Sequence, residues 1–443
     1  MRGRRGTTAR AGHGGPPAGG RAGAVVLASV MVLGPCGVLP GQEAVADEAT
    51  GGYAFAEGAR RIDGAPSTAG SLPLEPGRTY RSTLPASGTV YYRLELDGST
   101  SVHASATVVP PAGRTASVID GVKVSVQDGE GRSCDVDTAS FGTAGSLHPV
   151  AAWAMREISP RKSLCQRAGT YYLSAERVDP QGEGASSGPW EMELTTVAEP
   201  AARRTGATSA PEEWNSAPPR PPAGKPERRP GGAGFARAAP VGQGVWRDDI
   251  RPGRTLFYRV PVGWGQQLHA TAELDGPDAG GGYVAAALDL DLYNPVRGRV
   301  VDVGVGYDGG RKAESLAPLP PVAYANRYAA GPRDGAMRFA GAYYLVAHLS
   351  AEVADVFGDG PVPLTLRVRL SGTAQEGPAY LGESVPPDVF TVTEEDSRAA
   401  AEGEDASGAA AYRALAVGGI GTGTALLAGL GVWTLAARRR AVP

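Results

Sequence analysis

Four aspartates in the second half of the chain are the residues best suited to binding a metal ion. Asp289 and Asp291 are two positions apart, so a strand would present both carboxylates on one face. Asp275 and Asp278 lie in the Gly-rich turn that precedes this segment. Because Ca²⁺ takes about six to eight oxygen ligands, four neighbouring carboxylates could hold it. Calcium is the one cofactor that the sequence suggests; the alternative is that Asp289 and Asp291 form the wet face of an amphipathic strand.

The histidines come without the partners that catalysis requires. His103, His148, His269 and His348 are scattered, and no nucleophile elbow, zinc-protease motif, phosphate-binding loop or dinucleotide fingerprint accompanies them. His103 and His269 hold the same position in a repeated segment, where we expect both on the outward face of a strand. The sequence therefore predicts no catalytic residue and no enzyme. The alternative is an enzyme whose folded site brings His148 or His348 beside an acid and a nucleophile.

Cys134 and Cys165 are the cysteines that remain once a predicted N-terminal export signal is removed. Disulfides persist outside the cell, so this pair predicts a single bridge. A metal site would need more ligands than two thiols, and no C-x-x-C spacing is present. The net charge of −3 provides no basic field, so no nucleic-acid partner is expected.

The two ends of the chain carry signals for export and membrane insertion. Arginines precede an apolar run from Ala24 to Leu33, and Ala44-Val45-Ala46 offers a cleavage site, which predicts a signal peptide. Leu415 to Ala437 is 23 residues without a charge, long enough for a transmembrane helix. Arg438-Arg439-Arg440 follow at once. Because positive charge stays in the cytoplasm, we expect the C-terminus inside the cell and the body of the chain outside.

The predicted transmembrane segment also has a spacing that favours contact between helices. Gly419 and Gly423 form a G-x-x-x-G pair, which lets two helices approach closely. A helix-mediated dimer is therefore possible, and a glycine-rich span without a partner is the alternative.

One sequence pattern occurs twice in the body of the chain. Thr89 to Val108 aligns with Thr255 to Leu274 without a gap, and six of the twenty positions are identical. Val90, Tyr92, Leu94 and Leu96 alternate with polar residues, which is the period of a strand with one buried face. Asp97-Gly98 then predicts a turn into a second strand, as in a β-hairpin or its equivalent. Two copies of a module rich in short alternating strands predict two β-sandwiches.

The order of these strands resembles that of the bacterial pre-peptidase C-terminal (PPC) domain. The second copy carries F-Y-R-V at Phe257, D-L-D-L-Y at Asp289 and G-A-Y-Y-L-V at Gly341, in the family's order. The first copy keeps the first and last strands of this order but lacks the D-x-D-L-Y signature. The resemblance covers most of 72–197 and 243–372. It implies a jelly-roll-like β-sandwich of the kind appended to secreted hydrolases, in which some members bind calcium. The paired arrangement is also similar to that of actinobacterial surface proteins.

Composition between the modules predicts spacers. Pro218-Pro219-Arg220-Pro221-Pro222 lies in a proline-rich stretch with few apolar residues, and acidic residues gather after the second module. The resulting organisation is a signal peptide (1–46), a flexible N-terminal segment (47–71), a first sandwich (72–198), a disordered proline-rich linker (199–240), a second sandwich (241–372), a disordered acidic stalk (373–413), a transmembrane helix (414–437) and a basic cytoplasmic tail (438–443).

The sequence thus predicts an all-β, single-pass protein of the cell membrane that binds or scaffolds without catalysis. Its expected partner is a surface protein or a cell-wall polymer. The aromatic residues that could stack on sugars are Tyr171, Tyr172, Tyr343, Tyr344, Trp190, Trp246 and Trp264, although one ring of each tyrosine pair is expected to pack inside. The alternatives are an accessory subunit of a separate surface peptidase and a carbohydrate-binding module. The fold alone specifies no ligand.

Overall fold

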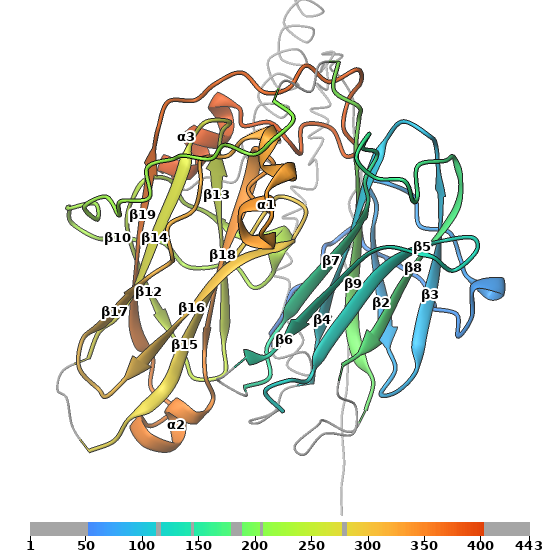
Figure 1. Ribbon diagram of the computed structural model, residues 1–443. Helices are drawn as coiled ribbons and strands as arrows, with labels where there is room; N and C mark the ends of the chain where they lie inside the picture. The colour runs from blue at the N-terminus through green and yellow to red at the C-terminus, as the bar shows by residue number, and fades with distance from the viewer. Residues whose placement is uncertain are drawn as a thin grey trace, which may run out of the picture. The chain divides into compact units, whose positions relative to one another are not determined.

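The computed structural model describes residues 52–111, 117–142, 146–178, 188–203, 207–276 and 281–402. Strands supply most of its regular structure, which confirms the predicted all-β fold (Figure 1). The predicted signal peptide, transmembrane helix and basic tail lie outside the described residues, as do Asp278, Gly419 and Gly423. Within the described ranges, no helix is both long and apolar enough to cross a membrane.

The first sandwich consists of two sheets that enclose an apolar core. One sheet has the order β1-β2-β9-β4-β7, with strands Arg60–Arg61, Thr79–Leu84, Trp190–Glu199, Ser101–Val109 and Val150–Arg156. The other has the order β3-β8-β5-β6, with strands Thr89–Leu96, Gly169–Arg177, Gly121–Asp128 and Ser133–Ser140. The alternating residues of β3 are buried as predicted. The predicted hairpin is wrong, however, because β3 pairs with β8 while β4 pairs with β7 and β9 in the opposite sheet.

The second sandwich repeats this connectivity. Its first sheet has the order β10-β12-β19-β14-β17, with strands Glu227–Arg228, Gly244–Ile250, Val362–Ser371, Gln267–Leu274 and Lys312–Ser315. Its second sheet has the order β11-β13-β18-β15-β16, with strands Ala239–Pro240, Thr255–Val262, Gly341–Leu349, Val284–Tyr293 and Arg299–Tyr307. The order β12-β19-β14-β17 matches β2-β9-β4-β7, and β13-β18-β15-β16 matches β3-β8-β5-β6. The sequence repeat is therefore a repeat of sandwich topology.

Short helices decorate this framework. The α-helices are α1 (Pro332–Gly335), α2 (Glu352–Phe357) and α3 (Glu394–Glu402), and the 3₁₀ helices are η2 (Thr68–Gly70), η4 (Phe235–Arg237) and η5 (Tyr324–Tyr328). Residues 324–338, which include η5 and α1, lie beside the first sandwich, where Arg327 and Arg338 take part in the contact described below.

The predicted disordered linker is partly built into the second sandwich. β10 pairs in parallel with β12, and β11 pairs in parallel with β13, so both extend sheet edges. Between them, η4 buries Phe235 against Phe257. The predicted flexible segment 47–71 likewise contains β1 and the buried Tyr53. Proline-rich composition obscured these contacts, since a two-residue edge strand tolerates prolines and carries little sequence signal.

The first part of the predicted stalk also differs from the expectation. Residues 373–393, which we call the strap, leave β19 and reach the first sandwich, where Ala198 bridges Val385 and Ala202 bridges Tyr380 (Figure 1). The chain then returns to the second sandwich as α3, whose Ala400 carbonyl accepts a hydrogen bond of 2.9 Å from the Gly242 amide. Ala399 and Ala400 are buried there. The described part of the segment is thus packed on both sandwiches.

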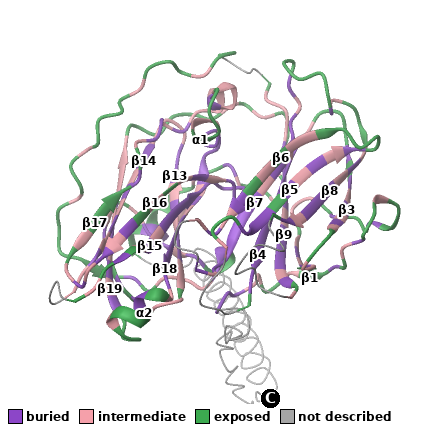
Figure 2. Cartoon of the chain, turned by 60° about the horizontal axis from the view of Figure 1, so that its bottom comes forward, coloured by how far each residue is buried: buried purple, intermediate pink, exposed green. Residues whose placement is uncertain are grey.

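The two sandwiches meet through the outer faces of two sheets. Val109 and Ala151 of the first sandwich share an apolar cluster with Phe257, Tyr293 and Val346 of the second. All nine residues of β4 are buried, because one face packs on its own core and the other on the neighbouring sandwich (Figure 2). Because this sheet buries apolar residues on both faces, the two sandwiches pack together as one continuous unit.

The predicted disulfide is present and joins Cys134 of β6 to Cys165 in the loop before β8. The two residues are 31 positions apart, so the bridge closes a long loop. We expect the double variant Cys134→Ser/Cys165→Ser to lose about 3 kcal/mol of unfolding free energy, because the open loop gains entropy in the unfolded chain. Urea titration of oxidised wild type and variant measures this difference; equal midpoints would contradict it.

Candidate functional site

The aspartates proposed to bind calcium do not form one cluster. Asp289 and Asp291 lie on β15, whereas Asp275 forms an ion pair of 3.0 Å with Arg311. Asp278 lies outside the described residues. No group of three or more His, Cys, Asp or Glu residues in the described ranges could hold a metal ion. The calcium prediction therefore finds no support in this part of the chain.

Asp289 and Asp291 instead form an acidic pair at the sheet face that meets the first sandwich. Arg299 lies 3.5 Å from Asp291 and 3.4 Å from Asp302, its neighbour on β16. Burial, together with the charges of Asp291 and Asp302, raises the pKa of Asp289 to about 7. Burial also raises the pKa of Asp291 to about 6, although the Arg299 guanidinium opposes this shift. Ionisation of these two carboxyl groups is therefore less favourable in the folded chain than in water.

The variant Asp289→Asn should be more stable than wild type at pH 8 by about 1–3 kcal/mol. In the unfolded chain this carboxyl ionises near pH 4, whereas in the folded chain it holds its proton to about pH 7. Folding stability therefore falls as pH rises through this window, and asparagine removes the loss. Urea titrations at pH 8 and pH 4 test this, since the gap should close at pH 4. An equal gap at both values would contradict the account.

The paired histidines of the two repeats occupy different environments. His103 lies on the face of β4 that points away from its own core, as expected, yet it is only 1% exposed, and its Nε2 donates to Glu199 at 3.3 Å. The second sandwich covers the face of β4 on which it lies, and His103 packs against Phe339. His269 is half-buried and bonds the Ser371 hydroxyl at 3.0 Å. The same repeat position thus differs because only one of the two equivalent sheet faces meets the other sandwich.

His148 and His348 stack on each other across the two sandwiches. Their ring centroids are 4.3 Å apart, and His348 Nε2 lies 2.9 Å from the Ser146 hydroxyl. Ser146 is fully buried and both rings are at most 5% exposed, so a substrate has no access to this pair. His348 Nδ1 meets the Thr255 hydroxyl at 3.0 Å instead of a carboxylate. The arrangement lacks the orienting acid and the open face of a serine–histidine nucleophilic site.

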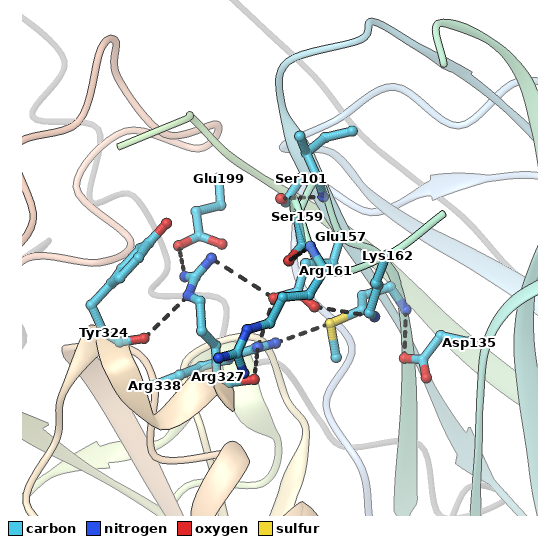
Figure 3. Close-up of polar contacts among 12 residues, drawn as sticks. Ser101, Asp135, Glu157, Ser159, Arg161, Lys162, Glu199, Tyr324, Arg327 and Arg338 are labelled. Atoms are coloured by element: carbon cyan, nitrogen blue, oxygen red, sulfur yellow. Dashed lines mark hydrogen bonds and ion pairs between the residues drawn. The ribbon is translucent and has the colours of Figure 1, made fainter. Parts of the chain in front are cut away.

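A buried network of ion pairs joins the sandwiches near α1 and η5 (Figure 3). Arg338 contacts Glu157 at 2.7 Å, and Arg327 contacts Glu199 at 2.6 Å. All four side chains are at most 7% exposed. Arg327 also lies 3.8 Å from Glu157, and Lys162 lies 3.1 Å from it, so the pairs form a continuous cluster. The carboxylates come from the first sandwich, while Arg327 and Arg338 come from the second.

The electrostatics of Glu199 show how strongly this network holds its charge. Burial alone would raise its pKa, but the Arg327 charge and the His103 hydrogen bond lower it to about 2. The Tyr380 hydroxyl from the strap donates to the same carboxylate at 3.0 Å. Glu199 therefore gathers one residue from the first sandwich, one from the second and one from the strap. The arrangement positions three segments; it offers no free nucleophile or base.

A separate ion pair holds another part of the same interface. Arg297, between β15 and β16, contacts Glu193 of β9 at 2.5 Å. Glu193 also accepts from the Tyr53 hydroxyl at 3.2 Å and from the Ala56 amide at 2.8 Å. The guanidinium of Arg297 lies 4.9 Å from the centroid of the Phe235 ring. Glu193 is fully buried, so it is satisfied only by groups that the interface brings together.

An open groove of about 690 Å³ lies where the strap passes the second sandwich. One wall comes from the β13–β14 turn with Trp264 and Gln266, and the other from the strap and the start of α3. Its further lining residues are Gly263, Ala340, Ala374, Gln375, Gly377, Pro378, Tyr380, Phe390, Thr391, Val392, Thr393, Glu394 and Ser397. The groove is the described cavity that combines aromatic rings with unpaired amides, and we treat it as the candidate binding site.

Of the aromatic residues proposed to stack on sugars, Trp264 alone lines this groove. Trp190 and Trp246 are buried in the two cores, and Tyr171 and Tyr343 are the inward members of their pairs. Their partners, Tyr172 and Tyr344, are half-buried. Sequence reasoning missed Gln266, Gln375, Tyr380, Phe390 and Glu394, because most of these lie in a segment that was expected to be a disordered stalk.

Comparisons with known proteins add no family assignment. No protein-family model matches the chain, and no curated protein matches it. Solved structures that match the chain at a low level of similarity include the CBM22-1-CBM22-2 tandem domain from Paenibacillus barcinonensis, at 11% identity over 64% of this chain and 83% of that chain, with a TM-score of 0.17. The tandem CBM51 modules of a family 98 glycoside hydrolase from Streptococcus pneumoniae match at 7% identity, 65% and 83% coverage and a TM-score of 0.17.

A third solved structure is the ANX1 ectodomain from Arabidopsis thaliana, at 7% identity over 69% of this chain and 92% of that chain, with a TM-score of 0.17. At TM-scores this low, none of these neighbours contributes to the functional argument. The resemblance to the PPC domain stays a prediction.

Proposed function

We propose that this chain is a non-enzymatic binding or scaffold protein of the cell surface, whose two sandwiches act as one rigid module. The observation that carries the proposal is the buried interface, in which Glu157 and Glu199 meet Arg338 and Arg327. Separation of the sandwiches would break these ion pairs and would also expose to water the apolar cluster that Val109 and Ala151 share with Phe257, which is unfavourable. Two modules on a flexible linker would need no such contact.

The proposed location is the outer face of the cell membrane, with the C-terminus in the cytoplasm. The sequence signals for export and insertion support it. α3 ends at Glu402, and the predicted transmembrane helix begins at 414, which leaves eleven residues, 403–413, between them. Eleven residues span at most about 40 Å when fully extended. The module would therefore lie close to the membrane surface instead of standing on a long stalk.

Crosslinking in intact cells tests the proposed function. The full chain, carrying an affinity tag, would be crosslinked in the producing cell, solubilised and purified under denaturing conditions. One dominant surface protein, or covalently retained wall polymer, is the expected result. A peptidase as the dominant partner would favour the alternative of an accessory subunit. Recovery of nothing beyond the profile of an unrelated single-pass protein would contradict a binding role.

A further inference from the structure

We propose that the groove beside the strap is a subsite for an uncharged oligosaccharide. This inference rests on the proposed binding function and names the ligand class for it. The groove has room for several sugar rings, since its volume of about 690 Å³ lies within the usual range for ligand sites. Its two walls come from segments far apart in sequence, the β13–β14 turn and the strap.

Trp264 supplies the apolar surface that a sugar ring needs. Its indole lines the groove and is half-buried, and its Nε1 donates no hydrogen bond within the described residues. The face of a pyranose ring carries C–H groups that pack on an aromatic plane, while the hydroxyls at its edge seek polar partners. A tryptophan side chain, which combines an aromatic face with one polar N–H, suits both needs.

Unpaired amides and a carboxylate surround this ring. The Gln266 Oε1 accepts from the Gly263 amide at 2.8 Å, which leaves its NH₂ group without an acceptor in the described chain. The side chains of Gln375 and Glu394 also form no hydrogen bond or ion pair there, although both line the groove. Amide and carboxylate groups of this kind can each bind one or two sugar hydroxyls.

The charge of the lining excludes one ligand class. The residues around the groove include Glu394 but no lysine or arginine. Phosphate and carboxylate polymers are bound by arginine, lysine or clustered backbone amides. The groove therefore fits a neutral glycan better than an anionic wall polymer.

The groove is also preorganised. The backbone N–H of Gln375 donates to the backbone carbonyl of Trp264 at 2.8 Å. Phe390 stacks on Phe339, with ring centroids 4.8 Å apart. Tyr380 is oriented by its hydrogen bond to Glu199. The strap thus holds its wall in place before any ligand arrives, which lowers the entropy cost of binding.

Gly377 packs against Trp264, so a substitution at Gly377 can test the role of this wall. A Cβ atom at this position would lie 2.2 Å from Trp264 Nε1, so alanine must displace the indole. Gly360, in the loop before β19, has nothing within 4 Å of the corresponding Cβ position. Gly377→Ala therefore disturbs the groove, and Gly360→Ala is the control that makes the same chemical change at a site with open space.

Titration calorimetry of the detergent-solubilised full chain tests the subsite. The probes are tetrasaccharides of N-acetylglucosamine, glucose and xylose, with poly(glycerol phosphate) as the anionic comparison. We expect at least one neutral tetrasaccharide to bind, with affinity reduced about tenfold or more in Trp264→Ala and severalfold in Gly377→Ala. Gly360→Ala should bind as wild type does. Unchanged thermal midpoints would show that each variant is folded.

Absence of binding by all three neutral tetrasaccharides at millimolar concentration would overturn the subsite, as would equal binding by Trp264→Ala. Stronger binding of poly(glycerol phosphate) than of any neutral probe would overturn the ligand class. The crosslinking experiment separates this failure from failure of the proposed function. If Trp264→Ala retains its crosslinked partner and no sugar binds, the binding role stands while the groove is excluded.

Discussion

Replacing Arg327 with alanine should lower the free energy of unfolding by about 3–5 kcal/mol and loosen the contact between the sandwiches. Arg327 is buried, and it contacts Glu199 at 2.6 Å and Glu157 at 3.8 Å. Its removal leaves Glu199 with only the neutral donors of His103 and Tyr380. The carboxylate would then be buried with no cation in direct contact, since Arg338 acts on it only through its charge, and its pKa, now about 2, should rise.

Urea titration and small-angle scattering of the full chain measure the two effects. Arg333→Ala is the matched control, because Arg333 lies six residues further along, is half-exposed and contacts only its neighbour Asp334. An exposed pair of this kind contributes little, so we expect a change of less than about 1 kcal/mol. Equal effects of the two substitutions would mean that the buried network does not hold the interface.

Acidification should weaken the same interface through His148 and His348. Burial lowers the pKa of His148 to about 4, and burial together with the charge of His148 lowers the pKa of His348 well below its usual value. Unfolded histidines titrate near pH 6.5, so the unfolded chain binds more protons between pH 6.5 and 4. Stability is therefore lost as pH falls through this window, by about 3 kcal/mol for His148 alone.

The acidic pair beside these rings has the opposite dependence, because Asp289 and Asp291 gain stability as pH falls below about 7. The comparison of wild type with His148→Gln/His348→Gln isolates the histidines. The variant should be less stable at pH 7.5 and should lose less stability by pH 4. His269→Gln is the control, since His269 lies away from the interface and bonds only Ser371. Parallel pH profiles for wild type and the double variant would contradict the assignment.

The sequence predicted those parts of the fold that repeat a simple pattern. The alternation in Thr89–Leu96 marked a strand with one buried face, and the repeat at Thr255 marked its counterpart in the second sandwich. The disulfide was also predicted, because two cysteines remain after the signal peptide and both are expected outside the cell. Each of these features depends on local periodicity or on counting, which a single sequence contains.

The pairing of the sandwiches could not be predicted in the same way. β4 is buried on both faces, yet its polar residues His103, Ser105 and Thr107 suggested a wet outer face. Polar groups can be buried when hydrogen bonds satisfy them, and the partners of His103 and Ser105 are Glu199 and Thr195 of the neighbouring strand β9, which lie 96 and 90 residues further along the chain. The groove was missed for a related reason: the acidic and Ala/Gly-rich composition of the strap gave no sign that Tyr380 and Phe390 anchor it.

Distance measurement between spin labels tests the central claim that the sandwiches form one rigid module. Ser87→Cys, in the turn between β2 and β3, and Asp359→Cys, after α2, are exposed positions on the two sandwiches. Double electron–electron resonance on the labelled full chain at pH 7.5 should give a single narrow distance distribution, which Arg327→Ala broadens. A broad distribution in the wild-type background would mean that the sandwiches move independently, and it would contradict the account.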